Sequence, residues 1–190
     1  MDTGHRLDTL AVADRTAAWR RALAIGAAAL VVAASARVSV PVPLSPVPMT
    51  LQPLAVLAVG GLLGAVSGGA ALLLYLALGM FGLPVFAAGG AGIGHVLGPT
   101  GGYLLAFPAA AAVAGRFAGT SPRLGRVLIG CALAMVVIHA GGAAQLVILG
   151  GDPGLALRVG FVPFLTGDLL KVGIAAAVIL GLGPKLRTLL

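Results

Sequence analysis

The chain has 190 residues, of which 59% are hydrophobic and 9% are charged, and its formal net charge is +7. A soluble domain of this size cannot bury so much apolar surface, so the composition predicts an integral membrane protein. The positive charge does not indicate nucleic-acid binding, because the basic residues lie in tails and short connections, as topology signals do. The single cysteine, Cys131, excludes an intramolecular disulfide.

A polar tail, residues 1–17, precedes six apolar segments, which predict an all-α protein with one transmembrane domain over residues 18–190. The predicted spans cover about residues 22–36, 51–66, 70–83, 99–116, 127–149 and 160–182. Basic residues gather in the tail, between the fourth and fifth spans, and at the C-terminus. The other connections contain only Arg37 and Arg158. The positive-inside rule therefore predicts that both termini are cytoplasmic.

The connection between the first two spans, residues 39–50, is apolar and contains four prolines. Proline lacks an N–H and biases its predecessor towards extended geometry, so this connection is predicted to be an extended strap over the outer face. We call residues 39–50 the strap. Ser67-Gly68-Gly69 predicts a tight turn between the second and third spans, and a glycine-rich connection covers residues 87–98.

The last span contains Asp168 and Lys171, which share one helix face because they are three residues apart. If the span enters the bilayer near Gly160, they lie about 12–16 Å deep. Each charge costs at least about 2.5–3.5 kcal/mol there, so both are expected to face the protein interior or a cavity. They form either a functional site or a structural pair that neutralises itself.

Three further features leave alternatives open. In the first span, Ala24 and Ala28 are small residues four apart, a spacing that allows close packing against a partner helix or against the protein's own helices. For His139, near the middle of the fifth span, a packed, neutral core position is favoured over contact with a ligand. Gln145, nearer the outer face, is equally compatible with packing and with ligand contact.

Several chemistries have no motif in this chain. It contains no glutamate, no phosphate-binding loop followed by Lys and Ser or Thr, and no Gly-x-Ser-x-Gly elbow. His5, His95, His139 and Cys131 do not have metal-ligand spacing. We therefore expect neither an enzyme, nor a metal site, nor a cofactor.

Four motifs together resemble the BioY family, the biotin-specific S components of energy-coupling factor (ECF) transporters. They are PMTLQ at 48–52, GLPVF at 82–86, LGPTGGYL at 97–104 and PFLTGDLLK at 163–171. The resemblance runs in order from about residue 20 to the C-terminus. It implies a six-helix S-component bundle with external loops over the substrate. It also implies transport that depends on a membrane T component and paired ATP-binding subunits, with no ATPase in this chain.

The same resemblance implies biotin as substrate and assigns candidate residues to it. Asp168 is expected to accept from the ureido N–H groups, and Lys171 to contact either the ureido carbonyl or the tail carboxylate. Ala24 and Ala28 are expected to meet the partner membrane subunit. The full set of expected substrate-binding residues is Asp168, Lys171, Gln52, Thr50, Phe86, Thr100, Tyr103 and Gln145.

Two other functions remain compatible with the sequence. One is a secondary permease for biotin or another small vitamin, acting alone or as a homo-oligomer. The other is a structural membrane subunit without a ligand. All three interpretations predict a multi-pass protein of the cytoplasmic membrane in contact with lipid.

Overall fold

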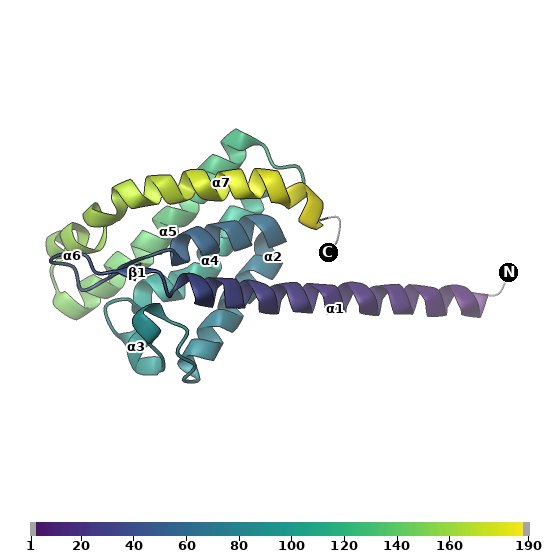
Figure 1. Cartoon of the computed structure of the whole chain (residues 1–190), viewed down its shortest axis with the longest axis horizontal. Coiled ribbons are helices and arrows are strands. Elements are labelled where there is room, and N and C mark those ends of the chain that lie inside the picture. The colour runs from purple at the N-terminus through teal and green to yellow at the C-terminus, as the bar shows by residue number, and fades with distance from the viewer. Residues whose placement is uncertain (1–2, 188–190) are drawn as a thin grey trace.

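The computed structural model describes the backbone of residues 3–187 and the side chains of residues 15–186. Helices form a bundle with one small sheet at one end (Figure 1). The elements are α1 (Thr3–Ser35), β1 (Ser39–Val40), β2 (Met49–Thr50), α2 (Gln52–Met80), η1 (Ala87–Gly89), α3 (Ile93–Leu97), α4 (Gly101–Ala118), α5 (Leu124–Gly150), α6 (Pro153–Gly160), η2 (Val162–Phe164) and α7 (Leu165–Arg187). The predicted tail is helical from Thr3 and extends α1 beyond the other helices (Figure 1).

Helix α2 consists of two helices that meet at Gly64. Gly64 has φ 82° and ψ 172°, a backbone conformation that favours glycine. A Cβ on Gly68 would lie 2.8 Å from the Cα of Gly60, although eight residues of straight helix span about 12 Å. The chain therefore folds back at Gly64, three residues before the predicted turn. With the two parts counted separately, the described residues form the six bundle helices that the sequence predicts.

Four described helical stretches are long and apolar enough to cross a membrane: Arg15–Ser35, Gln52–Met80, Leu124–Gly150 and Pro153–Leu186. The second is the folded-back α2, and α4 adds a shorter helix of 18 residues. Both chain ends lie at the same end of the bundle (Figure 1). This arrangement agrees with an even number of passes.

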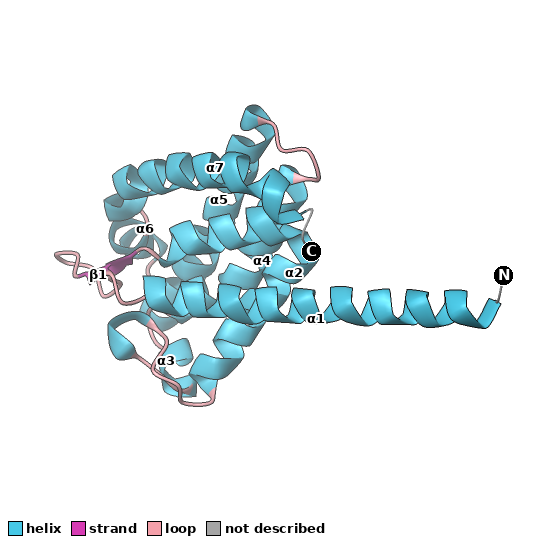
Figure 2. Cartoon of the chain, turned by 45° about the vertical axis from the view of Figure 1, so that its right-hand side comes forward, coloured by secondary structure: helices cyan, strands magenta, loops and turns pink. Residues whose placement is uncertain are grey.

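Helices α2 and α4 pack together at the centre, and α1, α5 and α7 pack around them (Figure 2). Helix α1 is the most peripheral of the candidate spans, because only 17% of its apolar window is buried. Ala28 lies in the chain's own core, whereas Ala24 is partly exposed. Of the two predicted partner contacts, only Ala24 keeps substantial accessible surface.

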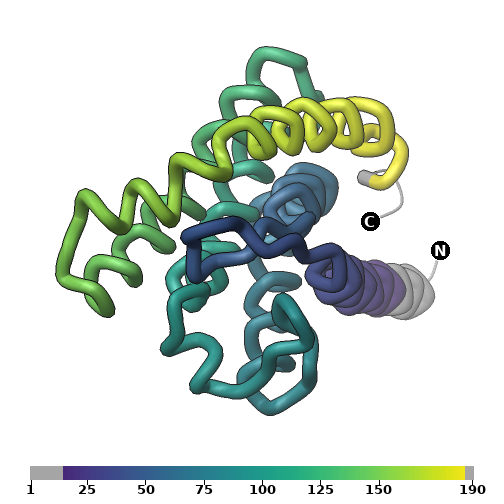
Figure 3. Tube along the Cα trace, turned by 60° about the vertical axis from the view of Figure 1, so that its left-hand side comes forward, coloured from purple at the N-terminus to yellow at the C-terminus, as the bar shows by residue number. Residues whose placement is uncertain are grey.

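The strap lies at the opposite end from the chain termini, between α7 and the connection around α3 (Figure 3). The sequence predicts extended chain here. The structure refines this into an antiparallel hairpin, in which Ser39 pairs with Thr50 and Val40 with Met49. The Ser45 hydroxyl donates to the carbonyl of Val159 at 2.7 Å, so the hairpin is tied to α6.

Candidate functional site

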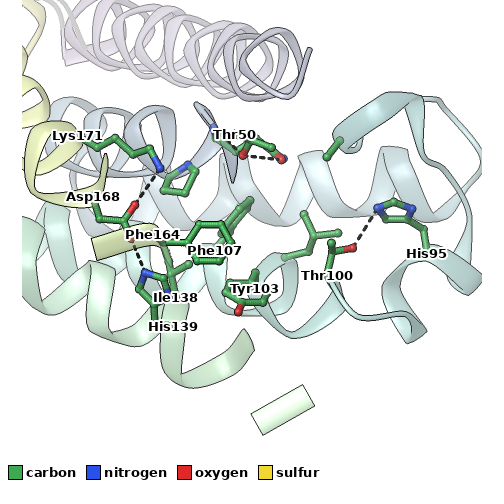
Figure 4. Close-up of a pocket in the computed structure, with 14 residues that line it drawn as sticks. Thr50, His95, Thr100, Tyr103, Phe107, Ile138, His139, Phe164, Asp168 and Lys171 are labelled. Carbon is green, nitrogen blue, oxygen red and sulfur yellow. Dashed lines mark hydrogen bonds and ion pairs between the residues drawn. The ribbon is translucent and has the colours of Figure 1, made fainter. Parts of the chain in front are cut away.

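A cavity of about 50 Å³ lies at the strap end of the bundle (Figure 4). It is lined by residues from the strap, the start of α2, α3, α4 and α5, and from η2 and the start of α7. Six of the eight predicted binding residues line it: Asp168, Lys171, Gln52, Thr50, Thr100 and Tyr103. The remaining lining residues are Pro53, Ala87, His95, Leu104, Phe107, Ile138, His139 and Phe164. Three of the four sequence motifs therefore meet at one cavity, and the GLPVF motif contributes no lining residue.

One end of the cavity carries a charged cluster of Asp168, Lys171 and His139. Lys171 Nζ donates to Oδ1 of Asp168 at 2.9 Å, and His139 Nε2 lies 2.6 Å from Oδ2. All three residues are buried. Each oxygen of the carboxylate thus has its own partner, which is the arrangement that makes a buried charge tolerable.

The start of α7 places this cluster. Pro163 belongs to the short 3-10 helix η2, and the α-helix begins only at Leu165, five residues later than the predicted span. Asp168 therefore lies in the first turn of α7, and its contact with His139 places it beside the middle of α5. The helix N-terminus carries partial positive charge that favours a carboxylate there.

The sequence favours a packed core position for His139 over ligand contact, and the structure places it in the core, at the cavity and against Asp168. It lines the cavity, contacts Asp168 directly, and packs edge-to-face on Phe161 with ring centroids 4.9 Å apart. Its Nδ1 is buried and has no hydrogen-bond partner among the described residues. Because His139 and Asp168 are 29 residues apart in the sequence, no local spacing signals their contact.

A second, neutral chain of hydrogen bonds, Thr50–Gln52–Tyr75, lines and supports another wall. Gln52 Nε2 donates to the Tyr75 hydroxyl at 2.6 Å, and that hydroxyl donates to the carbonyl of Val85 at 3.2 Å. The Thr50 hydroxyl donates to Gln52 Oε1 at 3.3 Å. These contacts fix the amide of Gln52 and leave one of its two N–H groups for other acceptors.

His95 and Thr100 lie at the far end of the cavity from Asp168 (Figure 4). Thr100 Oγ1 is 3.2 Å from His95 Nε2, and the His95 ring stacks on Phe86 with centroids 5.2 Å apart. Partial burial lowers the pKa of His95, so its ring is neutral at pH 7. This end of the cavity therefore offers polar but uncharged groups.

Tyr103 spans the wall between α4 and α6. Its hydroxyl donates to the carbonyl of Gly160 at 2.5 Å. A Cβ on Gly142 would lie 2.1 Å from the Tyr103 ring, so α5 needs glycine at that position for the ring to fit. Tyr103 therefore joins three elements and exposes one edge to the cavity.

Two predicted binding residues do not line the cavity. Phe86 is fully buried, where it packs edge-to-face on Tyr75 at 5.6 Å and stacks on His95. Gln145 donates from Nε2 to the carbonyl of Leu97 at 3.1 Å and so holds the end of α3. Phe86 therefore supports His95 in the wall, and Gln145 supports α3.

The cavity thus combines an ionised carboxylate, an ammonium, an amide and hydroxyls with apolar walls. Such a surface suits a small solute that has a polar, hydrogen-bonding ring and an apolar body. No group of three or more His, Cys, Asp or Glu side chains within the described part of the chain is placed to hold a metal. Fold and cavity together define a helical membrane protein with a candidate site for a small solute.

The chain belongs to the BioY family, whose model matches residues 9–188. It is 37% identical over 137 residues to the probable biotin transporter BioY of Pyrococcus horikoshii, covering 72% of this chain and 81% of that one. It is 39% identical over 141 residues to the biotin transporter BioY of Thermotoga maritima, covering 74% and 83%. The chain is a multi-pass protein of the cytoplasmic membrane.

A solved structure agrees over nearly the whole chain. The crystal structure of the S-component for biotin from an ECF-type ABC transporter superposes with a TM-score of 0.77 at 25% identity. The match covers 99% of this chain and 95% of that one. The helical bundle and its loops therefore follow an S-component fold.

Proposed function

We propose that this chain is the substrate-capturing S component for biotin uptake. The observation that carries the proposal is the charged cluster at one end of a cavity whose other lining residues are apolar or polar but uncharged. Its relatives are described as biotin transporters, and the solved structure as an S-component for biotin. Biotin acts as the transported substrate and not as a cofactor.

The ureido ring of biotin complements the charged cluster. It presents two N–H donors and one carbonyl acceptor, all neutral. Asp168 accepts from the N–H groups, and Lys171 or the remaining N–H of Gln52 donates to the carbonyl. Because the ligand is neutral at this end, the ion pair between Asp168 and Lys171 remains balanced when it binds. Phe107, Ile138 and Leu104 line the cavity beside the apolar thioether ring.

The biotin tail then extends towards Thr100 and His95, at the other end. Thr100 is the N-cap of α4 and makes no capping bond with its own side chain. The first turn of a helix has unpaired N–H groups that favour a carboxylate. This orientation favours the ureido contact for Lys171 over the alternative tail contact.

Binding requires the walls to move outward. A cavity of about 50 Å³ holds only a few water molecules, which is less than a bicyclic ring requires. The strap contributes Thr50 to the wall, and α3 contributes His95. We propose that the strap and α3 open to admit the ligand and then close over it.

Transport is proposed to depend on partners. The sequence contains no phosphate-binding loop, and the solved relative is a component of an ABC transporter. ATP hydrolysis is therefore assigned to paired ATP-binding subunits acting through a membrane T component. Biotin uptake in a host with and without these subunits separates this function from a solitary permease, which would transport equally in both.

The test is biotin binding by the purified full chain in detergent. Asp168→Asn is expected to weaken binding at least about 100-fold, because it removes the charged acceptor. Asp152→Asn is the matched control: it makes the same change at the α6 N-cap, outside the cavity, where asparagine also caps well. Wild-type protein that folds but does not bind biotin would contradict the proposal and favour a structural subunit.

A further inference from the structure

A groove of about 480 Å³ opens at the end of the bundle that carries the termini, opposite the biotin cavity. It lies where α1, the fold-back of α2 and the end of α4 meet. Its lining residues are Arg21, Leu63, Gly64, Ala65, Ser67, Gly115, Arg116, Gly119 and Thr120. None of them is acidic.

Arginines surround this groove. Arg21 donates from Nε to the Ser67 hydroxyl at 2.8 Å, which holds its guanidinium across the groove and leaves the Nη donors available. Arg116 forms no hydrogen bond or ion pair with any described residue. Arg126 Nη2 lies 2.9 Å from the position of a Cβ on Gly119, so a third guanidinium borders the groove.

Acids that could neutralise these arginines are distant within the described part of the chain. Its described acidic side chains are Asp152, at the N-cap of α6, and Asp168, inside the biotin cavity. Among the side chains of residues 15–186, the groove therefore carries positive charge with no acid beside it, which favours an anionic occupant.

The residues beside the groove are of the kinds expected at the depth of lipid headgroups. Arg21 immediately precedes the apolar run of α1, and the exposed Trp19 lies two residues before it, as expected of an interfacial anchor. Leu63 and Ala65 provide apolar wall beside the arginines. A ligand that fits must carry negative charge beside an apolar body.

We propose that this groove binds an anionic phospholipid, with the headgroup phosphate on Arg21 and Arg116 and an acyl chain along the apolar wall. Arginine guanidinium groups match phosphate oxygens in a bidentate geometry. The Ser67 and Thr120 hydroxyls provide further donors for the headgroup. The site is independent of the biotin cavity and anchors the junction of α1, α2 and α4 to the inner leaflet.

The experiment uses Trp19, the chain's only tryptophan, as a reporter. The full chain is reconstituted in phosphatidylcholine vesicles with increasing brominated phosphatidylglycerol or brominated phosphatidylcholine, and quenching of Trp19 gives the relative association of the two lipids. We expect phosphatidylglycerol to be preferred on the order of tenfold, since each arginine near the surface favours anionic lipid.

Two variants with the same loss of charge test the site. Arg21→Gln/Arg116→Gln is expected to remove the preference. Arg20→Gln/Arg123→Gln changes two arginines at the same end that do not line the groove, and it is expected to keep most of the preference. Biotin binding at the opposite end serves as the folding control in both.

Each contrary result overturns the proposal. Equal quenching by the two lipids in the wild type would exclude an anionic-lipid site. An equal loss in both double variants would indicate diffuse surface attraction. Relief of quenching by millimolar glycerol phosphate would indicate a free phosphate ester. If the groove variant lowers only uptake with partner subunits and leaves lipid preference intact, the occupant is an acidic partner segment.

Discussion

Two sets of hydrogen-bonded polar residues form parts of the wall of the biotin cavity, and they are built differently. The charged cluster joins Asp168, Lys171 and His139 across α5 and α7. The neutral chain joins Thr50, Gln52 and Tyr75 within the strap and α2. Both are buried, but only the first depends on balance of charge, because removal of one member leaves an ionised group unpaired.

This difference indicates separate roles. We expect the charged cluster to determine whether a ligand with complementary donors binds at all. The neutral chain orients Gln52 through hydrogen bonds that each contribute about 0.5–1.5 kcal/mol. Substitutions in the cluster should therefore affect folding and binding strongly, and substitutions in the chain should affect mainly binding and only mildly.

The largest effect is expected from Lys171→Met. It leaves the buried Asp168 carboxylate without its cation and should destabilise the protein by about 3–5 kcal/mol as well as abolish biotin binding. Thermal unfolding in detergent measures the first effect and ligand binding the second. The double variant Asp168→Asn/Lys171→Met should recover most of the stability without recovering binding. Equal instability of single and double variants would contradict a charge-balance role.

His139→Phe is expected to have the next largest effect. It preserves an aromatic ring against Phe161 but removes the hydrogen bond to Asp168. Biotin affinity should fall about 10- to 100-fold, as for loss of a charge-assisted hydrogen bond. Calorimetry in the wild-type and Asp168→Asn backgrounds measures the coupling. If His139→Phe lowers biotin affinity by the same factor in the Asp168→Asn background as in the wild type, His139 does not act through Asp168.

Gln52→Leu tests the neutral chain. The change keeps the volume but removes the N–H available to the ligand, so biotin affinity should fall roughly tenfold while the unfolding temperature changes little. Gln145→Leu is the matched control, because Gln145 bonds only to backbone carbonyls at the end of α3 and does not line the cavity. A similar loss of biotin affinity in both variants would show that the Gln52 amide has no specific role in binding the ligand.

Tyr75→Phe should give the smallest effect. The ring that packs on Phe86 remains, and only the hydroxyl between Gln52 and Val85 is lost. Biotin affinity should fall about two- to fivefold, because Gln52 loses one orienting contact but keeps its place on α2. In the Gln52→Leu background the same change should have no effect on affinity. A loss as large as that of Gln52→Leu would mean that Tyr75 itself contacts the ligand.

The sequence predicts those parts of the site that depend on local spacing. Asp168 and Lys171 are three residues apart on one helix, and their charge within an apolar run predicts burial together. The contact of His139 with Asp168 depends on how α5 packs against α7, and the hydroxyl contact of Tyr75 depends on the connection after α2. Local spacing carries no signal of either contact, so the sequence favours a packed core position for His139 over ligand contact and gives no indication of its bond to Asp168.

The fold shows the same limit of prediction from local sequence. Glycines and prolines predict where the chain turns, but Ser67-Gly68-Gly69 resembles a turn more than Gly64 does. The structure uses Gly68 for the close approach to Gly60 and Gly64 for the reversal. Likewise, prolines predict an extended strap, whereas the pairing of Ser39 with Thr50 depends on contacts between residues far apart.

The end of α6 connects the strap to the binding site through hydrogen bonds. Two successive carbonyls there accept side-chain hydroxyls: that of Val159 from Ser45 in the strap, and that of Gly160 from Tyr103 on α4. The chain continues through η2 into the turn that holds Asp168. We therefore expect opening of the strap to be coupled to rearrangement of the carboxylate, and any such coupling is reciprocal. A ligand held by Asp168 favours the closed strap by the same factor as the closed strap favours the ligand.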